Sequence, residues 1–239
     1  NLGGTLVGTD CKVEVNKACD GTLQTKVAAA SDTRDIKMKV GGSLASFSMT
    51  NISAVGMGAH FSSSFLLNGD AATTPVTPGL SQAATMSPTQ QALLTGDNLV
   101  NYLRGQTGFE DKASNPVDNR IFRYREATMG DAVESQPAYV SRPVFNYADS
   151  GYGSFIAANA SRQTVVFLGA NDGMLHAFNA DNGQELWAYV PSQVIPNLYK
   201  LADKNYSTQH AYSVNGNAVV GDAYFDGAGH TILVGSLSG

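Results

Sequence analysis

Three short apolar runs joined by tight turns constrain the fold of this chain more than any other feature of its sequence. The runs cover residues 164–168, 174–178 and 185–190, and each has the length of a single strand. The connection between the last two ends in Gly183, placed where a hairpin requires a positive φ angle. Three consecutive strands joined in this way form a meander, the unit of a β-propeller blade. We therefore predict that the runs are neighbours in one antiparallel sheet, with no helix between residues 164 and 190.

An internal repeat supports this prediction. TVVFLGANDG, residues 164–173, aligns without a gap with HTILVGSLSG, residues 230–239, so that Gly169 matches Gly235 and Gly173 matches Gly239. The two copies lie further apart than the about 40–45 residues of a simple propeller blade. An insertion must therefore separate them, and residues 191–217, rich in Pro, Tyr and Asn, are its expected place.

Charge and hydropathy exclude several classes of partner. The net charge is −5, only 15% of the residues are charged, and no run of Lys or Arg occurs. Nucleic acid and anionic membranes are therefore poor candidates. The apolar stretches are much shorter than the roughly 20 residues that span a bilayer, so no membrane span is predicted. Because the chain starts at Asn1 without a signal-type segment, we interpret it as a piece of a larger protein.

The rest of the chain divides into three predicted regions. Residues 1–70 alternate short β-type runs, such as 36–40, with Gly and Asn turns, and predict a small β-subdomain. Residues 71–98 contain three prolines and read as a linker or long loop and the start of a helix, and the opening propeller blades fill residues 99–239. The helix is expected over 90–104, or over 98–104 with Asp97 as its cap and Gly105 at its end. From residue 130 onward we expect almost only antiparallel sheet, including a strand at 137–140.

The only two cysteines are Cys11 and Cys19. Their spacing matches no common zinc or redox motif. Two β-type runs on either side of a turn at Asn16 and Lys17 could form a hairpin that brings the sulfurs together. We predict that Cys11 and Cys19 form a disulfide, which would require an oxidising compartment; two unpaired thiols are the alternative.

The sequence contains no compact catalytic or metal-binding signature. None of the four histidines stands at ligand spacing from another His or a Cys, and His176 is predicted to be a packed, hydrogen-bonded core residue. Residues 179–183 and the pair Asp222 and Asp226 resemble parts of a calcium loop but lack the remaining ligands. We predict neither a metal nor a cofactor in this chain, and no enzymatic activity.

Several motifs in fixed order suggest a family. LVNYLRGQ at residues 99–106, FRYRE at 122–126, MGDAVESQPAYVSRP at 129–143 and the long stretch 166–194 are followed by VNGNAVVGDAYF at 214–225 and TILVGSLSG at 231–239. This ordered set resembles the start of the C-terminal β-propeller domain of the type IV pilus tip adhesins, the PilC/PilY family. Residues 1–98 resemble the family only vaguely.

The resemblance implies an all-β chain with modified, quinoprotein-like propeller blades, preceded by a small β-subdomain and a short helix. It implies export through the periplasm to the pilus tip or bacterial surface, and action by binding rather than catalysis, in adhesion and in pilus assembly or retraction control. The implied partners are minor pilins and a host-cell or abiotic surface. Family members carry a calcium loop later in the propeller, so calcium is implied for a full-length protein but for none of these residues.

Two alternatives remain beside this interpretation. A quinoprotein-like dehydrogenase would need a quinone held by calcium and often a vicinal Cys pair, whereas Cys11 and Cys19 are not adjacent. A purely structural scaffold of an extracellular filament differs only in whether its exposed loops bind a receptor.

The candidate interaction loop is the insertion at residues 191–217. Blade strands are committed to packing, whereas connections leave side chains free to bind a partner. The loop offers Tyr199, Tyr206, His210 and Tyr212, and tyrosines supply contact area and a hydroxyl at a low entropic cost. The alternative is that the insertion only covers the edge of a sheet.

Overall fold

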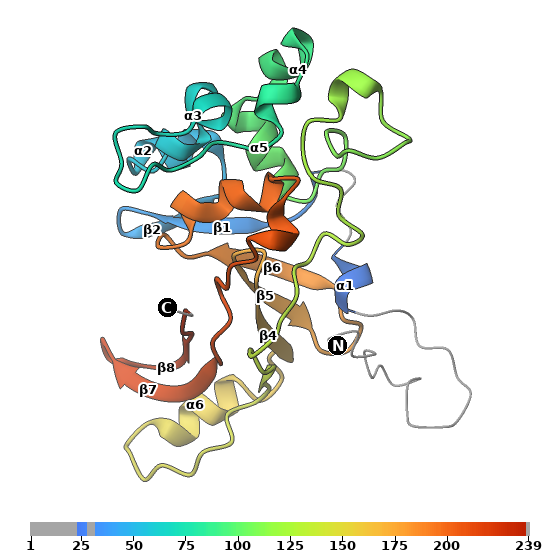
Figure 1. Cartoon of the computed structure of the whole chain (residues 1–239). Helices are drawn as coiled ribbons and strands as arrows, with labels where there is room; N and C mark the ends of the chain where they lie inside the picture. The colour runs from blue at the N-terminus through green and yellow to red at the C-terminus, as the bar shows by residue number, and fades with distance from the viewer. Residues whose placement is uncertain (1–22, 28–31, 238–239) are drawn as a thin grey trace, which may run out of the picture.

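A computed structural model describes residues 23–27 and 32–237. Its main sheet contains the predicted blade (Figure 1). Strands β3 (Ala138–Val140), β4 (Val165–Ala170), β5 (Met174–Asn179) and β6 (Glu185–Val190) pair antiparallel in sequence order. The three predicted runs are therefore neighbours in one sheet without an intervening helix, which confirms the meander. A bulge at Ala177 and Phe178 interrupts the ladder between β5 and β6.

Two further strands begin a second unit of the same kind. Strands β7 (Val219–Phe225) and β8 (Ala228–Val234) form a separate antiparallel hairpin. Its turn places Asp226 at φ 52° and Gly227 at φ 77°, the left-handed region that a tight turn requires. The two copies of the sequence repeat thus fall on β4 and β8, each the second strand of its unit. One four-stranded blade and the opening of the next confirm the partial propeller.

The main sheet continues beyond the blade through an earlier part of the chain. Strand β1 (Ile36–Val40) runs parallel to β6, and β2 (Ser43–Ser46) pairs antiparallel with β1. The resulting order is β2-β1-β6-β5-β4-β3. Burial favours this arrangement, because Ile36 and Met38 on β1 have almost no exposed surface.

The helical content is larger than the sequence predicts, and it includes the region where only sheet is expected. The α-helices are α1 (Leu23–Lys26), α2 (Met49–Ala54), α3 (Ser63–Asn68), α4 (Pro88–Leu93), α5 (Gly96–Leu103) and α6 (Tyr152–Ala158), and the 3-10 helices are η1 (Ala59–Phe61), η2 (Ala83–Thr85), η3 (Val117–Asn119), η4 (Ile195–Ala202) and η5 (Tyr206–Thr208). Helices α6, η4 and η5 make the expectation of almost only antiparallel sheet after residue 130 wrong. They lie in connections between strands, whose apolar side chains follow helical rather than alternating spacing.

The helix predicted at 90–104 is in fact two short helices. The Ser87 hydroxyl accepts from the Gln90 N–H and the Gln90 side chain accepts from the Ser87 N–H, a capping box that starts α4. Thr95, not Asp97, caps α5, because its side chain accepts the N–H of Asn98. Gly105, at φ 105°, follows the end of α5 as predicted.

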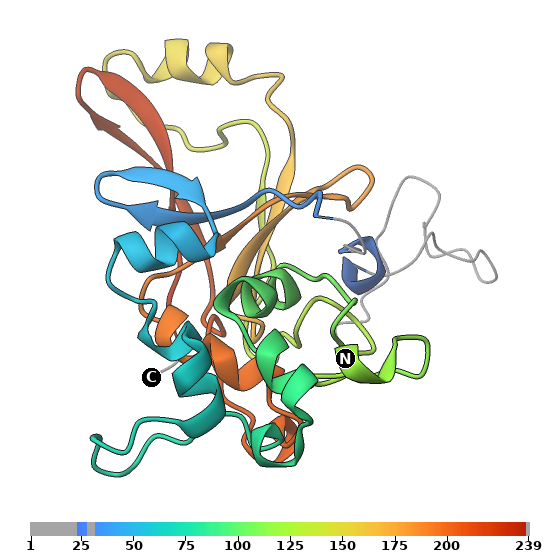
Figure 2. The same ribbon diagram turned by 90° about the horizontal axis from the view of Figure 1, so that it is seen from above.

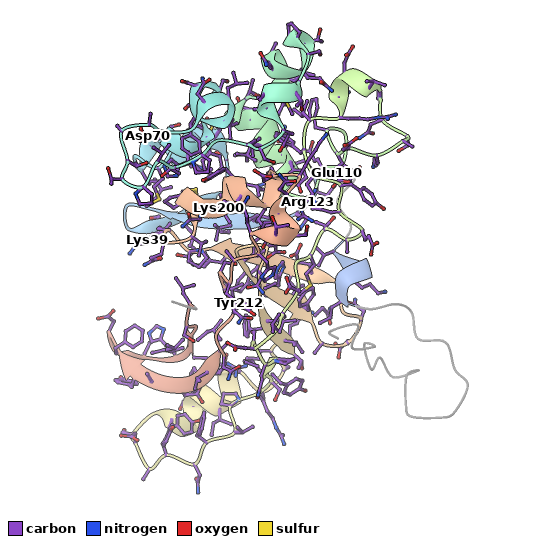
Figure 3. The ribbon with its side chains drawn as sticks, in the orientation of Figure 1. Lys39, Asp70, Glu110, Arg123, Lys200 and Tyr212 are labelled. Carbon is purple, nitrogen blue, oxygen red and sulfur yellow. The ribbon has the colours of Figure 1, made fainter. Side chains whose placement is uncertain are left out.

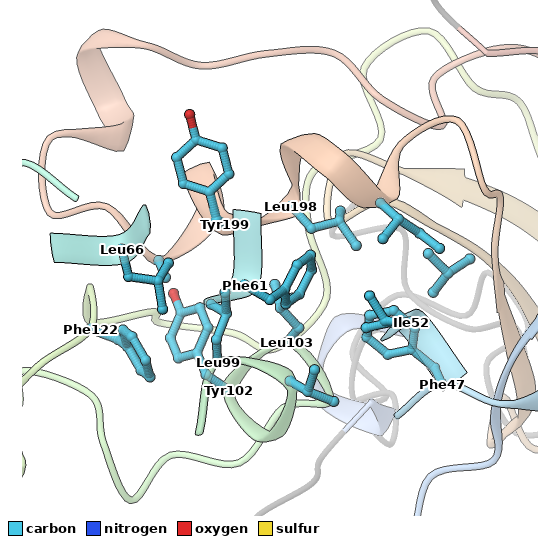
Figure 4. Close-up of a cluster of buried hydrophobic side chains, with 14 of the residues drawn as sticks. Phe47, Ile52, Phe61, Leu66, Leu99, Tyr102, Leu103, Phe122, Leu198 and Tyr199 are labelled. Atoms are coloured by element: carbon cyan, nitrogen blue, oxygen red, sulfur yellow. The ribbon is translucent and has the colours of Figure 1, made fainter. Parts of the chain in front are cut away.

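One hydrophobic core joins the helices to the outer half of the main sheet. Helices α2, α3 and α5 pack with η4 over β1 and β6, and α6 lies at the opposite end beside β7 and β8 (Figures 1 and 2). The largest buried side chains of this core come from both halves of the chain (Figure 4); they include Phe47, Ile52, Phe61, Leu66, Leu99, Tyr102, Phe122 and Leu198. Within the described residues, no helix is both long and apolar enough to cross a bilayer.

Candidate groove at the Asn171 edge

Alternating strand direction brings two connections of the blade to the same end of its strands. In an antiparallel meander, every second connection lies at the same end. Residues 171–173, between β4 and β5, therefore lie at the same end as the insertion between β6 and β7. We call this end of the strands the Asn171 edge. The connection that contains α6 lies at the other end.

A third segment, residues 123–131, is bound to this edge by hydrogen bonds. The Asn171 N–H donates to the Asp131 carbonyl at 2.8 Å, and the Gly130 N–H donates to Asp172 Oδ2 at 3.0 Å. Gly130 is required by the close approach of the two chains, because a Cβ there would lie 2.4 Å from the Asp172 nitrogen. The same segment is held to η4 through Arg123, whose Nε donates to the Leu201 carbonyl at 3.0 Å.

Two adjacent cavities at the Asn171 edge share part of their lining, and we call this pair of cavities the groove. The larger, about 420 Å³, lies along residues 123–131, and the smaller, about 230 Å³, lies against η4. Asn171, Leu201 and Tyr206 line both. Asn171 is almost fully buried; its Oδ1 accepts from the Ser213 N–H at 3.1 Å and its Nδ2 donates to Asp131 Oδ2 at 3.3 Å. The groove thus has a fixed, polar floor.

The structure separates the four predicted loop residues into two groups. Tyr199 is 2% exposed and packs edge-on against Phe65 and His60, so it belongs to the core and not to a binding surface. Tyr206 is also buried, and the Arg123 guanidinium lies 4.8 Å from the centroid of its ring. Tyr206 still forms part of the groove wall.

His210 and Tyr212 are the predicted residues that remain accessible. The rings of Tyr206, His210 and Tyr212 follow one another at centroid distances of 5.5 and 5.3 Å. His210 Nε2 lies 3.2 Å from the Asp131 carboxylate, and Tyr212 is 54% exposed at the rim of the smaller cavity. Tyr212 therefore lines the smaller cavity as an exposed ring, with the exposed His210 beside it and the buried Tyr206 next in the row.

A buried network of four charged side chains supports the groove from below. His176 has no exposed surface; its Nδ1 lies 2.7 Å from Glu185 Oε1 and its Nε2 lies 3.1 Å from Asp172 Oδ2. Glu185 in turn binds Arg34 through two contacts of 2.6 and 2.8 Å. This confirms that His176 is a hydrogen-bonded core residue. The network also connects the floor of the groove, through Asp172, to the segment that leads into β1.

The ion pairs within this network determine the protonation states of its side chains. Burial would lower the pKa of His176, but the Asp172 carboxylate and then Glu185 outweigh burial and raise the pKa to about 9. Burial would raise the pKa of Glu185, but hydrogen bonds from Arg34 and His176 lower it to about 2. Burial likewise opposes the lowered pKa of Asp172, which the charge of His176 causes. At neutral pH the network therefore holds two cations and two anions.

The described part of the chain places no group of three or more His, Cys, Asp or Glu side chains where they could hold a metal ion. Asp222, weighed as half of a calcium site, instead accepts hydrogen bonds from Tyr152 at 2.7 Å and from Thr231 at 2.7 Å. Cys11 and Cys19 lie outside the described residues, so their pairing stays a prediction.

Sequence reasoning missed Arg34, Asp172 and Lys200. Lys200, labelled in Figure 3, is the only charged residue among the described residues that line the smaller cavity. A single Lys inside the apolar stretch IPNLYKLA was the available signal for it. Arg34 carries no such signal, because its partner Glu185 comes from a distant part of the chain. Asp172 lies four residues before its partner His176, and this short spacing was the available signal for it.

Comparison with known proteins gives matches over part of the chain. A family model described as the PilY1 beta-propeller domain matches residues 125–239. The chain is 40% identical over 146 residues to a type IV pilus biogenesis factor PilY1 homolog of Xylella fastidiosa, covering 58% of this chain and 11% of the relative. It is 39% identical over 152 residues to the type IV pilus biogenesis factor PilY1 of Pseudomonas aeruginosa strain PAK, covering 59% and 12%. The chain thus spans about a tenth of the length of these relatives. No solved structure gives a significant match.

Proposed function

Residues 125–239 belong to the PilY1 β-propeller family, and from this premise we propose that the chain is part of a type IV pilus biogenesis factor that acts by binding partners at the Asn171 edge. The proposal includes export to the pilus tip or cell surface, and roles in adhesion and in pilus assembly or retraction control. Its partners would be minor pilins and a host-cell or abiotic surface. Calcium control would belong to other parts of a longer protein.

The groove at the Asn171 edge is the observation that carries this proposal. Its floor is fixed by Asn171 and by the charged network below, so a partner would meet side chains that are already ordered. A preorganised site loses less entropy on binding than a mobile loop. Tyr212, which lines the smaller cavity, and the neighbouring His210 present accessible aromatic rings that suit contact with protein or glycan.

Binding rather than catalysis is proposed because the two aspartates at this edge are engaged with neighbouring side chains. Asp172 is paired with His176, and Asp131 contacts both His210 and Asn171. A general acid or base would need a free group within reach of a substrate. The names of the relatives, which are those of pilus biogenesis factors and not of enzymes, point the same way.

Substitution of Tyr212 tests the proposal more cleanly than removal of the insertion. Deleting residues 191–217 would remove Ile195, Leu198 and Tyr199 from the core and would unfold the protein. In bacteria that produce the full-length protein, we expect Tyr212→Ser to lower adhesion several-fold, with the number of surface pili and the protein level unchanged. Tyr139→Ser is the matched control, since Tyr139 is 65% exposed and lies outside the groove. Adhesion equal to that of the wild type in Tyr212→Ser would refute the assignment of binding to this edge.

A further inference from the structure

The smaller cavity of the groove differs from its surroundings in charge. The described residues that line it include Lys200 but no carboxylate. Lys37 and Lys204 each pair with an aspartate, at 2.8 and 2.7 Å, whereas Lys200 has no acidic partner within the part of the chain that the structure describes. Lys200 is also partly buried. An ammonium group that a ligand covers gains from a counter-ion, because it loses part of its hydration on binding.

The walls of this cavity restrict the kind of anion that fits. Val194, Leu198, Leu201 and Leu237 supply apolar surface, and the amides of Gln193, Asn197 and Asn171 supply hydrogen-bonding groups. The volume of about 230 Å³ is below the about 300–1,000 Å³ of sites for drug-sized ligands. A single side chain with methylene groups and a terminal carboxylate matches both the size and the chemistry. Phosphate and sulfate would leave the apolar walls without contacts.

The adjoining, larger cavity leaves space for the polypeptide that carries such a side chain. It extends from the shared wall at Leu201 and Tyr206 along residues 123–131. Tyr212, exposed at the rim of the smaller cavity, can cover the apolar part of an inserted side chain. The larger cavity has charges of both signs, from Arg123 and Arg125 and from Glu126, Asp131 and Asp172, whereas Lys200 is the one charged residue among the described residues that line the smaller cavity.

We infer that the smaller cavity is a receptor for an acidic side chain, glutamate above all, on a protein partner, with the Lys200 ammonium as its counter-ion. This inference rests on the proposed function, in which the groove binds a protein. Lys200 is near the C-terminal end of η4, where a cation also favours the helix dipole. The interaction of Lys200 with the helix dipole would affect the stability of the protein but not its preference for one ligand over another.

Two peptides of five residues, acetylated and amidated, separate charge recognition from shape recognition. One has a central glutamate between two leucines, and the other has glutamine in its place. In an NMR titration of the 239-residue chain at low salt, we expect the glutamate peptide to bind about tenfold more tightly, as a charge-assisted hydrogen bond allows. Lys200→Gln should abolish this preference and Lys200→Arg should retain part of it. Lys39→Gln, which removes an exposed cation outside both cavities (Figure 3), should leave it unchanged.

Four results would overturn the inference. These are equal binding of the two peptides, a preference that survives Lys200→Gln, displacement of the glutamate peptide by an equal concentration of sulfate, and tighter binding of sialyllactose than of the peptide. If Lys200→Gln does not fold, Lys200→Arg and the loss of the preference at 0.5 M salt decide the question. Should the peptides bind equally while Tyr212→Ser still lowers adhesion, the inference is wrong and the proposed function stands.

Discussion

At the residue scale, His176 supports the groove through its ion pairs, although it never contacts a ligand in our proposal. It joins Asp172 to Glu185, and through Glu185 to Arg34. A buried pair that loses one partner leaves a charge without compensation, and this costs about 3–5 kcal/mol. The imidazolium therefore stabilises the fold only as long as both carboxylates face it.

The raised pKa of His176 predicts a loss of stability in alkali. The unfolded side chain titrates near 6.5 and the folded one near 9. The stabilisation by its charge is therefore complete below pH 6.5 and is lost as the pH rises through 9. We expect the free energy of unfolding, measured in urea, to fall between pH 7 and 9.

His176→Gln is the control for this pH dependence. It should cost about 3 kcal/mol at pH 6 and should remove the slope between pH 7 and 9. The acid side is set separately by the lowered pKa of Glu185: its contribution is present above 4.5 and is lost as the pH falls towards 2. A slope of the same size in the variant would assign the alkaline loss to other groups.

At the scale of elements, β4 and β8 carry the two copies of the sequence repeat but differ in how they are packed. A Cβ at Gly169 would lie 2.4 Å from the Val214 carbonyl oxygen, because the end of the insertion crosses β4 at this point. At the matching Gly235, a Cβ would meet nothing within 4 Å in the described residues. The same glycine therefore has a steric role in the first copy and none in the second.

We expect Gly169→Ala to destabilise the 239-residue chain by about 1–3 kcal/mol, the cost of overpacking a close contact. Gly235→Ala, the matched control, should change stability by less than about 0.5 kcal/mol. Urea unfolding of both variants measures this directly. Equal effects would show that the crossing at Val214 does not restrict β4.

At the scale of the whole molecule, the early part of the chain and the blade share one core. Ile36, Phe47 and Leu99 belong to the same cluster of buried residues as Val190 and Leu198. The parallel pairing of β1 with β6 and the bond between Arg34 and Glu185 join the same two parts. The boundaries predicted at residues 70 and 98 stay a prediction, which unfolding can test.

A shared core predicts one cooperative unfolding transition. The single Trp, Trp187, reports on β6 in the blade, whereas far-UV circular dichroism reports mainly on the helices. We expect the two signals to change at the same urea concentration. Arg34→Met should move both midpoints together. Two separate transitions would instead favour independent domains with boundaries near residues 70 and 98.

The sequence by itself determined the strands of the blade and the positions of the turns between them. The alternation of apolar and polar residues, the length of each strand and the position of Gly183 are local properties. They can therefore be read from the sequence without knowing how the rest of the chain folds. The same holds for the strand at β3, for Gly105 after α5, and for the core position of His176. The ordered motifs, which identify the family, are also readable without the fold.

Only the tertiary structure decided which of the loop residues are accessible and where the charged groups meet. Tyr199 and Tyr212 look alike in the sequence, but helical spacing in η4 directs Tyr199 into a core built from residues far away along the chain. Arg34 and Glu185 are separated by most of the chain, so no local pattern could pair them. The parallel pairing of β1 with β6 is also non-local, because it depends on which faces of the two strands are buried in the folded chain.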